Sequence, residues 1–195
     1  MKQFLTAVVI FSTLFVCQAY AKTWIVDQNG LGDYTTIMAA INVAKPGDVI
    51  KVHPGIYNEK VVIDKEIIVE GSGAESTMIS NQNLDHAVEI SAGKIRWFSI
   101  SAQHAGVKAI GGTLTNCVII NCRIMGVDCY TNAKIINCIA ISNQEHGFFI
   151  KNNQNPIIHN CISVYNKQRG FDVENLNQNI GIQYCNSWGN GNNWR

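Results

Sequence analysis

The sequence has almost no excess of charge of either sign: its 195 residues include 15 Lys and Arg against 14 Asp and Glu. A protein that binds nucleic acid by electrostatic attraction needs a basic face and usually a pI above about 9. The near balance excludes this class, and it also excludes a polyanionic disordered tail. Because about 100–200 residues make up one domain, we expect a single domain.

The sequence also lacks an apolar run long enough to cross a membrane. The segment Phe4–Val16 is too short for a span, and with Lys2 before it and Ala19-Tyr20-Ala21 after it, it has the pattern of a secretory signal. We therefore expect residues 1–21 to be removed and the mature protein to be periplasmic or secreted, where thiols can oxidise. A lipoprotein signal ending at Cys17 is the less favoured alternative, because bulky residues precede that cysteine.

Leucine is scarce after the signal, and the Leu-x-x-Leu-x-Leu frame of leucine-rich repeats is absent. A different repeat is present: Gly or Ala followed by an apolar-x-apolar alternation returns every 19 to 23 residues. Its copies are Ala87-Val88-Glu89-Ile90, Gly106-Val107-Lys108-Ala109, Gly126-Val127-Asp128-Cys129, Gly147-Phe148-Phe149-Ile150 and Gly170-Phe171-Asp172-Val173. A second motif, with Asn or Tyr before Cys, recurs at the same pitch from Asn116, Asn137, Asn160 and Tyr184.

This repeat predicts a coil of parallel strands. Period-2 alternation rich in Ile and Val disfavours helices. Asn and Gly tolerate the left-handed conformation that tight corners need. With about 22 residues in each turn, we predict an all-β solenoid of about six turns.

One helix is expected before the first turn, near residues 35–44. Asp33 or Thr35 can cap its start, and Pro46-Gly47 ends it. Its apolar positions fall on one face: Ile37, Ile41 and Ala44. An amphipathic helix at this place covers the open end of a solenoid core, so we predict an N-terminal capping helix.

The other end of the sequence shows no such cap. After Trp188-Gly189-Asn190-Gly191 a new turn begins, and the sequence stops at Arg195. An open strand edge favours association. We expect either that self-association or a partner covers this turn, or that the chain is the front part of a longer β-helix enzyme that lacks its active site here.

Five segments early in the mature chain carry a family resemblance: Gly32-Asp33-Tyr34-Thr35-Thr36-Ile37, Ala39-Ala40-Ile41, Pro46-Gly47-Asp48, Pro54-Gly55-Ile56-Tyr57-Asn58-Glu59 and Gly71-Ser72-Gly73. They resemble the opening of pectinesterase-like right-handed parallel β-helix proteins. The later Gly170-Phe171-Asp172 and 186–191 are similar to turns of pectate lyase-like β-helices. The resemblance implies one right-handed parallel β-helix domain over residues 22–195. It also implies binding or processing of an acidic cell-wall polysaccharide such as pectate, although unrelated functions share this scaffold.

The candidate site follows from the alternation, because side chains two apart on a strand share a face. The outward columns are Glu89, Lys108, Asp128, Phe149 and Asp172, and then Ser91, Ile110, Tyr130, Lys151 and Glu174. The resemblance implies catalytic groups on the outward face of one strand stack. The candidate catalytic residues are Lys151, Asp128, Asp172, Arg169 and His146, and the candidate substrate-binding residues are Tyr130, Glu174 and Trp188.

One hypothesis for this face is a calcium-dependent lyase, in which the cation neutralises a uronate carboxylate and Lys or Arg removes the α-proton. Asp128 and Asp172 are the candidate metal ligands. They lie two turns apart, about 10 Å, whereas calcium binds oxygen at about 2.3–2.6 Å, so sharing one ion would strain both side chains. The alternative is a solvated ladder in which Lys151 pairs with Asp172 or Glu174.

A pectinesterase is less favoured, because the resembled family needs two Asp residues on successive turns and an Arg before an aromatic residue. The segment Cys122–Asp128 resembles the one with the first Asp, and Gln103 matches a family Gln loosely. No Asp lies in residues 146–150, and Arg169-Gly170-Phe171 matches only distantly. We therefore expect any enzyme to be pectate lyase-like. A non-catalytic surface or adhesion solenoid is the alternative from another class.

Six cysteines follow the signal, and no Cys-x-x-Cys pair favours zinc. Four of them share one place in successive turns: Cys117, Cys138, Cys161 and Cys185. Turn spacing puts neighbours within disulfide range, so the column predicts either buried thiols, which is favoured, or one or two bridges. The many late asparagines predict a hydrogen-bonded ladder, and the alternative is sugar binding beside Tyr165, Trp188 or Trp194.

Overall fold

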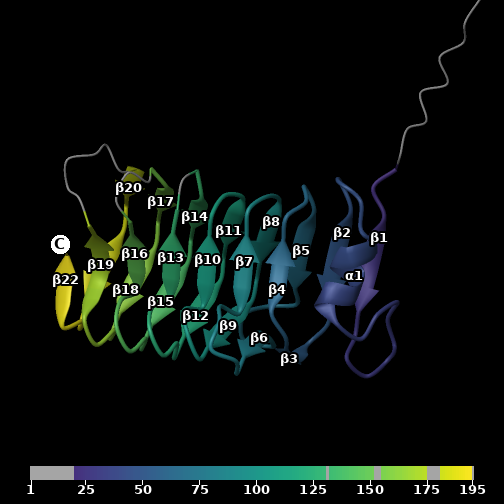
Figure 1. Ribbon diagram of the computed structural model, residues 1–195, viewed down its shortest axis with the longest axis horizontal. Helices are drawn as coiled ribbons and strands as arrows, with labels where there is room; N and C mark the ends of the chain where they lie inside the picture. Colours follow the sequence, from purple (N-terminus) through teal and green to yellow (C-terminus); the bar gives the residue numbers. More distant parts are fainter. Residues whose placement is uncertain (1–19, 131, 152–154, 175–180, 195) are drawn as a thin grey trace, which may run out of the picture.

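The computed structural model describes residues 20–130, 132–151, 155–174 and 181–194, and in this part of the chain it is a parallel β-solenoid of about seven turns (Figure 1). The expected fold class is confirmed, with one turn more than the period suggested. The expected signal segment 1–21 lies almost wholly outside the described residues. Within them, no helix is long and apolar enough to cross a bilayer.

Each turn contributes one strand to each of three parallel sheets, which we name A, B and C. Sheet A consists, in spatial order, of β1 (Thr23–Val26), β2 (Val49–Val52), β5 (Ile68–Gly71), β8 (Lys94–Arg96), β11 (Thr113–Thr115), β14 (Lys134–Ile136), β17 (Ile157–His159) and β20 (Gly181–Gln183). Sheet B consists of β3 (Gly55–Asn58), β6 (Thr77–Asn81), β9 (Ser99–Ala102), β12 (Val118–Ile120), β15 (Ile139–Ile141), β18 (Ile162–Val164) and β21 (Asn186–Trp188). Sheet C consists of β4 (Val61–Ile63), β7 (Val88–Ile90), β10 (Val107–Ala109), β13 (Val127–Cys129), β16 (Phe148–Ile150), β19 (Arg169–Val173) and β22 (Asn192–Trp194).

The core is a stack of inward side chains between the three sheets. In sheet C the inward residues are those that the alternation predicted, from Val88 and Ile90 to Phe171 and Val173, and all are buried. The rings of Phe148 and Phe171 stack with their centroids 4.9 Å apart. In sheet B the sequence left the direction open, and the structure places Cys117 and Ile119 inside.

The helix α1 (Ile37–Val43) lies at the N-terminal end of the stack, beside β1 and β2 (Figure 1). Its core-facing residues are Ile37, Ala40 and Ile41. The N-cap is Thr36, whose hydroxyl accepts a hydrogen bond from the Ala39 amide at 3.3 Å. The expectation of Asp33 or Thr35 as the cap was wrong, because Asp33 accepts a hydrogen bond from the Ile25 amide instead.

A carboxylate far away in the sequence completes this helix end. The two oxygens of Glu59 accept hydrogen bonds from the Ile37 and Met38 amides at 2.8 and 2.9 Å. These amides are among those that a helix start leaves without an intrahelical partner. Glu59 therefore ties the helix to the turn between β3 and β4.

The corners between sheets explain the recurring Asn residues. Between sheets A and B the corner residue has a positive φ in each of five turns: Trp97, Asn116, Asn137, Asn160 and Tyr184. Between sheets B and C the corresponding residues are Asn121, Ser142, Tyr165 and Gly189. Asn143 and Asn166, which follow strands of sheet B, are buried, and together with the half-buried Asn190 they form the predicted ladder.

In that ladder each side-chain amide supports the preceding turn. The Oδ1 atoms of Asn143, Asn166 and Asn190 accept hydrogen bonds from the amides of Cys122, Asn143 and Asn166 at 2.8 to 3.0 Å. Nδ2 of Asn143 donates to Asn166 Oδ1, and Nδ2 of Asn166 donates to Asn190 Oδ1, both at 2.8 Å. The predicted asparagine ladder is confirmed at these positions.

The cysteine column is present as predicted, with all six cysteines as thiols. Five are buried and Cys185 is half-buried. Burial raises the pKa of Cys117 and Cys122 to about 12, and a hydrogen bond with Cys138 raises that of Cys161 to about 12. Thiols with such pKa values are unreactive at neutral pH, because the thiolate is the nucleophile.

Candidate functional site

The outward side of sheet C, which we call face C, carries the predicted columns in register. Glu89 lies beside Lys108, Lys108 beside Asp128, Asp128 beside Phe149 and Phe149 beside Asp172. Although they face outward, Asp128 and Asp172 are only 5% and 4% exposed. Lys151 contacts the first of these carboxylates, and Arg169 and His146 contact the second.

The first of these clusters joins Asp128, Tyr130 and Lys151. The Lys151 ammonium donates hydrogen bonds to the Tyr130 hydroxyl at 2.6 Å and to Asp128 Oδ2 at 3.2 Å. The Tyr130 hydroxyl donates to the same carboxylate oxygen at 3.2 Å. The ladder considered for Lys151 involved Asp172 or Glu174, whereas its ammonium reaches back one turn to Asp128.

This environment controls the charge on Lys151. Burial lowers the pKa of its ammonium, but the hydrogen bond to Tyr130 and the charge of Asp128 outweigh burial and raise the pKa above its ordinary value. Lys151 is therefore a cation at neutral pH. It is suited to holding an anion and poorly suited to taking a proton.

The second cluster joins Asp172, Arg169 and His146. Arg169 Nη1 donates to Asp172 Oδ2 at 2.8 Å, and His146 Nε2 lies 3.5 Å from the same oxygen. The imidazole also stacks on Phe149, with ring centroids 5.6 Å apart. Burial lowers the pKa of His146, although the charge of Asp172 acts the other way. The imidazole is therefore neutral at neutral pH.

A third cluster at the N-terminal end of face C was missed from the sequence. Lys60 Nζ lies 2.6 Å from Asp85 Oδ2, and the hydrogen bond from Lys60 holds the pKa of Asp85 well below its usual range. Asp85 Oδ1 lies 3.0 Å from His86 Nδ1, and the His86 and His104 rings meet edge to face at 4.9 Å. The sequence did contain a signal for this cluster. His86 stands two residues before Val88, and the candidate His146 stands two residues before Phe148, which is the same place in the repeat.

Buried polar atoms without a hydrogen-bond partner gather on this face. Across the described residues there are five such atoms, and four belong to face C or its edge: His86 Nε2, His104 Nδ1, Asp128 Oδ1 and His146 Nδ1. Native proteins leave few buried polar groups unpaired, so a group of such atoms on one face makes that face a candidate for ligand binding. The concentration of these atoms distinguishes face C from the other two faces.

The structure brings six of the candidate residues together in two clusters, Asp128 with Tyr130 and Lys151, and His146 with Arg169 and Asp172. The other two candidates are Glu174, which lies beside Lys151 in the same outward column, and Trp188. Glu174 is exposed just after β19, and Trp188 lies on β21 in sheet B. Trp188 is therefore not part of face C.

The candidate calcium ligands do not fit one shared ion. Phe149 lies between Asp128 and Asp172 in the register, and each carboxylate contacts a cationic side chain. In the described residues, no group of three or more His, Cys, Asp or Glu side chains has an arrangement that could hold a metal ion. Phe149 also occupies the place beside Asp128 where a pectinesterase would need its second Asp.

Solved structures share this solenoid. Pectate lyase Pel9A aligns with a TM-score of 0.73 at 17% identity, over 87% of this chain and 54% of that one. Pectin methylesterase from carrot aligns with a TM-score of 0.65 at 19% identity, over 86% of this chain and 63% of that one. The fold is that of the pectinesterase and pectate lyase-like β-helices.

Pectin methylesterase PemA from Erwinia chrysanthemi aligns with a TM-score of 0.60 at 13% identity, over 87% of this chain and 66% of that one. At these identities the likeness is one of fold. The chain spans 63% and 54% of the carrot esterase and of Pel9A. No protein-family model and no curated protein sequence matches the chain.

Proposed function

We propose that the protein binds an acidic polysaccharide of the pectate type along face C. The observation that supports this most is the set of four buried, unpartnered polar atoms on that face or at its edge. Two buried carboxylates on the same face contact cationic Lys and Arg side chains. The structural neighbours named as pectin methylesterases and a pectate lyase make a uronate polymer the substrate class to test first.

The chemistry of face C suits carboxylate groups repeated along a chain. Lys108, Lys151 and Arg169 place cations on three turns of sheet C, and their side chains are 29%, 36% and 27% exposed. Each cation contacts an acidic side chain, which fixes its position before a ligand arrives. Pre-positioned donors lose less conformational freedom on binding than mobile ones.

The direct test is affinity electrophoresis of the mature protein in gels that contain polygalacturonate, with highly methylesterified pectin as the matched neutral polymer. We expect retardation by polygalacturonate that weakens as salt is added, because screening reduces attraction between exposed charges. Equal mobility in gels with and without polygalacturonate, from folded protein, would refute the proposal.

Lyase chemistry is the second candidate, because the neutral His146 imidazole is able to accept a proton whereas Lys151 is kept protonated. The test is the ultraviolet absorbance of unsaturated products during incubation with polygalacturonate, with and without added calcium. Product formation that is lost in His146→Gln supports this chemistry. Retention in gels without any absorbance change leaves binding alone as the function.

We also propose that the protein acts outside the cytoplasm, since a pectate-type polymer is a cell-wall component and residues 1–21 have the pattern of a secretory signal. Expression of the full sequence followed by N-terminal sequencing of the exported protein tests this. A mature chain that begins at Lys22 is the expected result. A cytoplasmic product that keeps residues 1–21 would contradict it.

A further inference from the structure

Trp97 occupies a corner where the later turns mostly have asparagine. It follows β8 with a φ of 65°, and the same corner is filled by Asn116, Asn137 and Asn160 in the next three turns. Asparagine tolerates this left-handed conformation, whereas a bulky side chain there is an outlier. Such outliers cluster at functional sites, so the tryptophan calls for a role beyond forming the corner.

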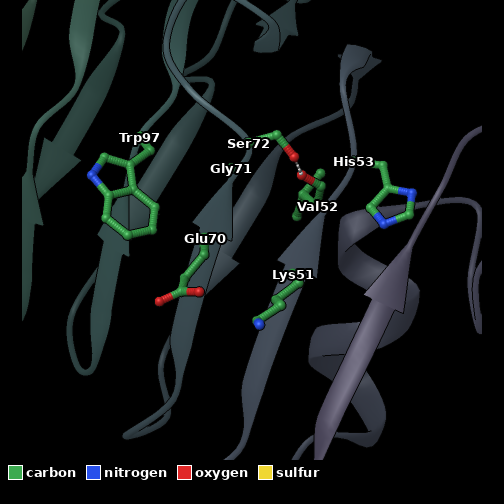
Figure 2. A pocket seen from close by; sticks show the side chains of 7 residues that line it. All are labelled: Lys51, Val52, His53, Glu70, Gly71, Ser72 and Trp97. Atoms are coloured by element: carbon green, nitrogen blue, oxygen red, sulfur yellow. Dashed lines mark hydrogen bonds between the residues drawn. The ribbon is translucent and has the colours of Figure 1, made fainter.

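A pocket of about 310 Å³ lies beside this tryptophan, on the outside of sheet A at its N-terminal end (Figure 2). It is lined by Lys51 on β2 and His53 just after it, by Glu70 and Gly71 on β5 and Ser72 just after it, and by Trp97. Gly71 is a requirement of the fold, because a Cβ there would overlap the backbone oxygen of Trp97.

The groups around the pocket are held in place by contacts outside it. Arg96 pairs with Glu70, and its guanidinium lies 4.2 Å from the centroid of the Trp97 ring. His53 Nδ1 lies 3.0 Å from Asp27 Oδ2. The fifth buried polar atom without a partner in the described residues is Arg96 Nε, so this is the one place outside face C where such an atom occurs.

The charges of the pocket favour an anion. Glu70 is neutralised by Arg96, and His53 is paired with Asp27. Lys51 is exposed and has no ion-pair partner among the described residues, which leaves one cation available. Figure 2 shows the Lys51 and Glu70 side chains between Trp97 and His53. A cation, an aromatic ring and hydrogen-bonding groups around one concavity suit a sugar that carries a carboxylate.

We propose that the pocket beside Trp97 is a second binding site, distinct from face C, for a uronate residue of a saccharide chain. Lys51 binds the carboxylate, the indole packs against the sugar ring, and Glu70 and Ser72 accept hydrogen bonds from its hydroxyl groups. The uronate class rests on the proposed function, whereas the site itself rests on the geometry of sheet A. Because sheets A and C are different faces of the solenoid, the two sites bind separate segments of polymer.

The test uses trigalacturonate and its methyl ester, with tryptophan fluorescence and calorimetry as readouts. The key variant is Trp97→Asn, which installs the residue that the next three turns use at this corner. We expect its melting temperature to stay equal or rise, while the fluorescence change disappears and the affinity of one class of sites falls about tenfold or more. Tyr184→Asn, which removes another exposed aromatic side chain from the same kind of corner after the last strand of sheet A, is the matched control and retains the binding.

Lys51→Met tests the charge, with Lys134→Met on β14 of sheet A as its control. We expect Lys51→Met to reduce trigalacturonate binding to the level of the methyl ester, and Lys134→Met to leave the difference intact. Unchanged binding in Trp97→Asn, or a preserved preference for the acid in Lys51→Met, would overturn the proposal. So would the absence of any fluorescence change at saturating trigalacturonate.

These outcomes are separable from those for face C. Lys151→Met removes a cation of face C and leaves sheet A intact, so it keeps the Trp97-dependent fluorescence change. Loss of polymer retention in Lys151→Met together with normal binding in Trp97→Asn supports face C and overturns the pocket. The reverse pattern supports the pocket and contradicts the function proposed for face C.

Discussion

Lys151 Nζ lies 3.2 Å from Asp128 Oδ2, across neighbouring turns of the solenoid. The carboxylate is buried and the Lys151 side chain is about one-third exposed. Asp128 therefore fixes the position of a cation that solvent can reach. Two substitutions at this pair have opposite expected effects on polymer binding.

Lys151→Met should weaken binding of polygalacturonate about tenfold, which corresponds to the loss of one charge-assisted hydrogen bond. Asp128→Asn should strengthen it, because it removes a negative charge beside the bound carboxylate while the amide oxygen and the Tyr130 hydroxyl still hold the ammonium. Affinity gels at several polymer concentrations measure both effects, with Lys134→Met as the control. A loss of binding in Asp128→Asn would mean that the negative charge of Asp128 is needed for binding, and this would contradict the expected gain.

Asp48 makes stability depend on acid pH. Its carboxylate accepts hydrogen bonds from the Lys45 and Lys22 amides and from the Trp24 indole, at 2.8 to 3.0 Å. The Lys45 amide contributes most to lowering its pKa below the ordinary value. A carboxyl group whose pKa is lower in the folded protein stabilises the fold above its unfolded pKa of about 4, and this is lost as pH falls through the folded value.

Asp48→Asn should therefore lower stability at pH 6 by about 2 kcal/mol, from weaker hydrogen bonds. The difference from the original protein should shrink as pH falls below about 4, because protonation removes the same charge. Thermal unfolding of both proteins from pH 6 to pH 2 measures this. A difference that stays constant across the range would show that the charge of Asp48 is not involved.

Gly147 precedes β16 at a place with no room for a side chain. A Cβ there would overlap the hydroxyl of Ser163, which belongs to the next turn in sheet B. Gly147→Ala should lower stability by about 1–3 kcal/mol, the usual cost of overpacking, and so lower the melting temperature by about 2–12 °C. Gly181→Ala is the control, since a Cβ there meets nothing closer than 3.6 Å. Equal melting temperatures for the two variants would contradict this origin of the glycine motif.

Asn166 holds the middle of the ladder, fully buried between the turns of Asn143 and Asn190. Asn166→Ala should lower the free energy of unfolding by about 2–4 kcal/mol, because it leaves at least two buried polar groups without partners. Asn42→Ala, at an exposed position of α1, should change stability by less than about 1 kcal/mol. Urea unfolding measures both, and similar losses in the two variants would contradict the ladder as a stabilising device.

The cysteine column gives a chemical prediction. Thiol titration of the mature protein in denaturant without reductant should find six thiols, one for each cysteine after the signal. In the folded protein Cys185 should react first, because it is the least buried of the six. Four thiols in the denatured sample would indicate one disulfide in the column.

The fold could be predicted because the alternation in each turn is strict. A side chain one residue further along a strand points to the opposite face, so Val127 and Cys129 identify Asp128 as outward without any structure. The alternation does not predict that the side chains of Asp128 and Asp172 are buried. That depends on the contact of Lys151 with Asp128 across neighbouring turns and on the contact of Arg169 with Asp172 within β19.

Contacts between distant segments were missed for the same reason. Glu59 caps a helix 22 residues before it, and no local pattern connects the two. The pocket beside Trp97 was visible in principle, since Trp97-Phe98 stands one turn before Asn116-Cys117 in the same motif. The tryptophan in the place of an asparagine at that corner was the signal. It can be interpreted only when the left-handed backbone conformation of the corner is known.

The strands of sheet C keep one register although the turns vary in length from 19 to 23 residues. This has a consequence for how the length of the chain changes in evolution. Residues gained or lost at a corner leave every column of face C in place. The same change inside a strand reverses inside and outside for the rest of that strand. Natural length variation is therefore expected at corners or as whole turns, and face C can lengthen by duplication while each existing cation keeps its neighbours.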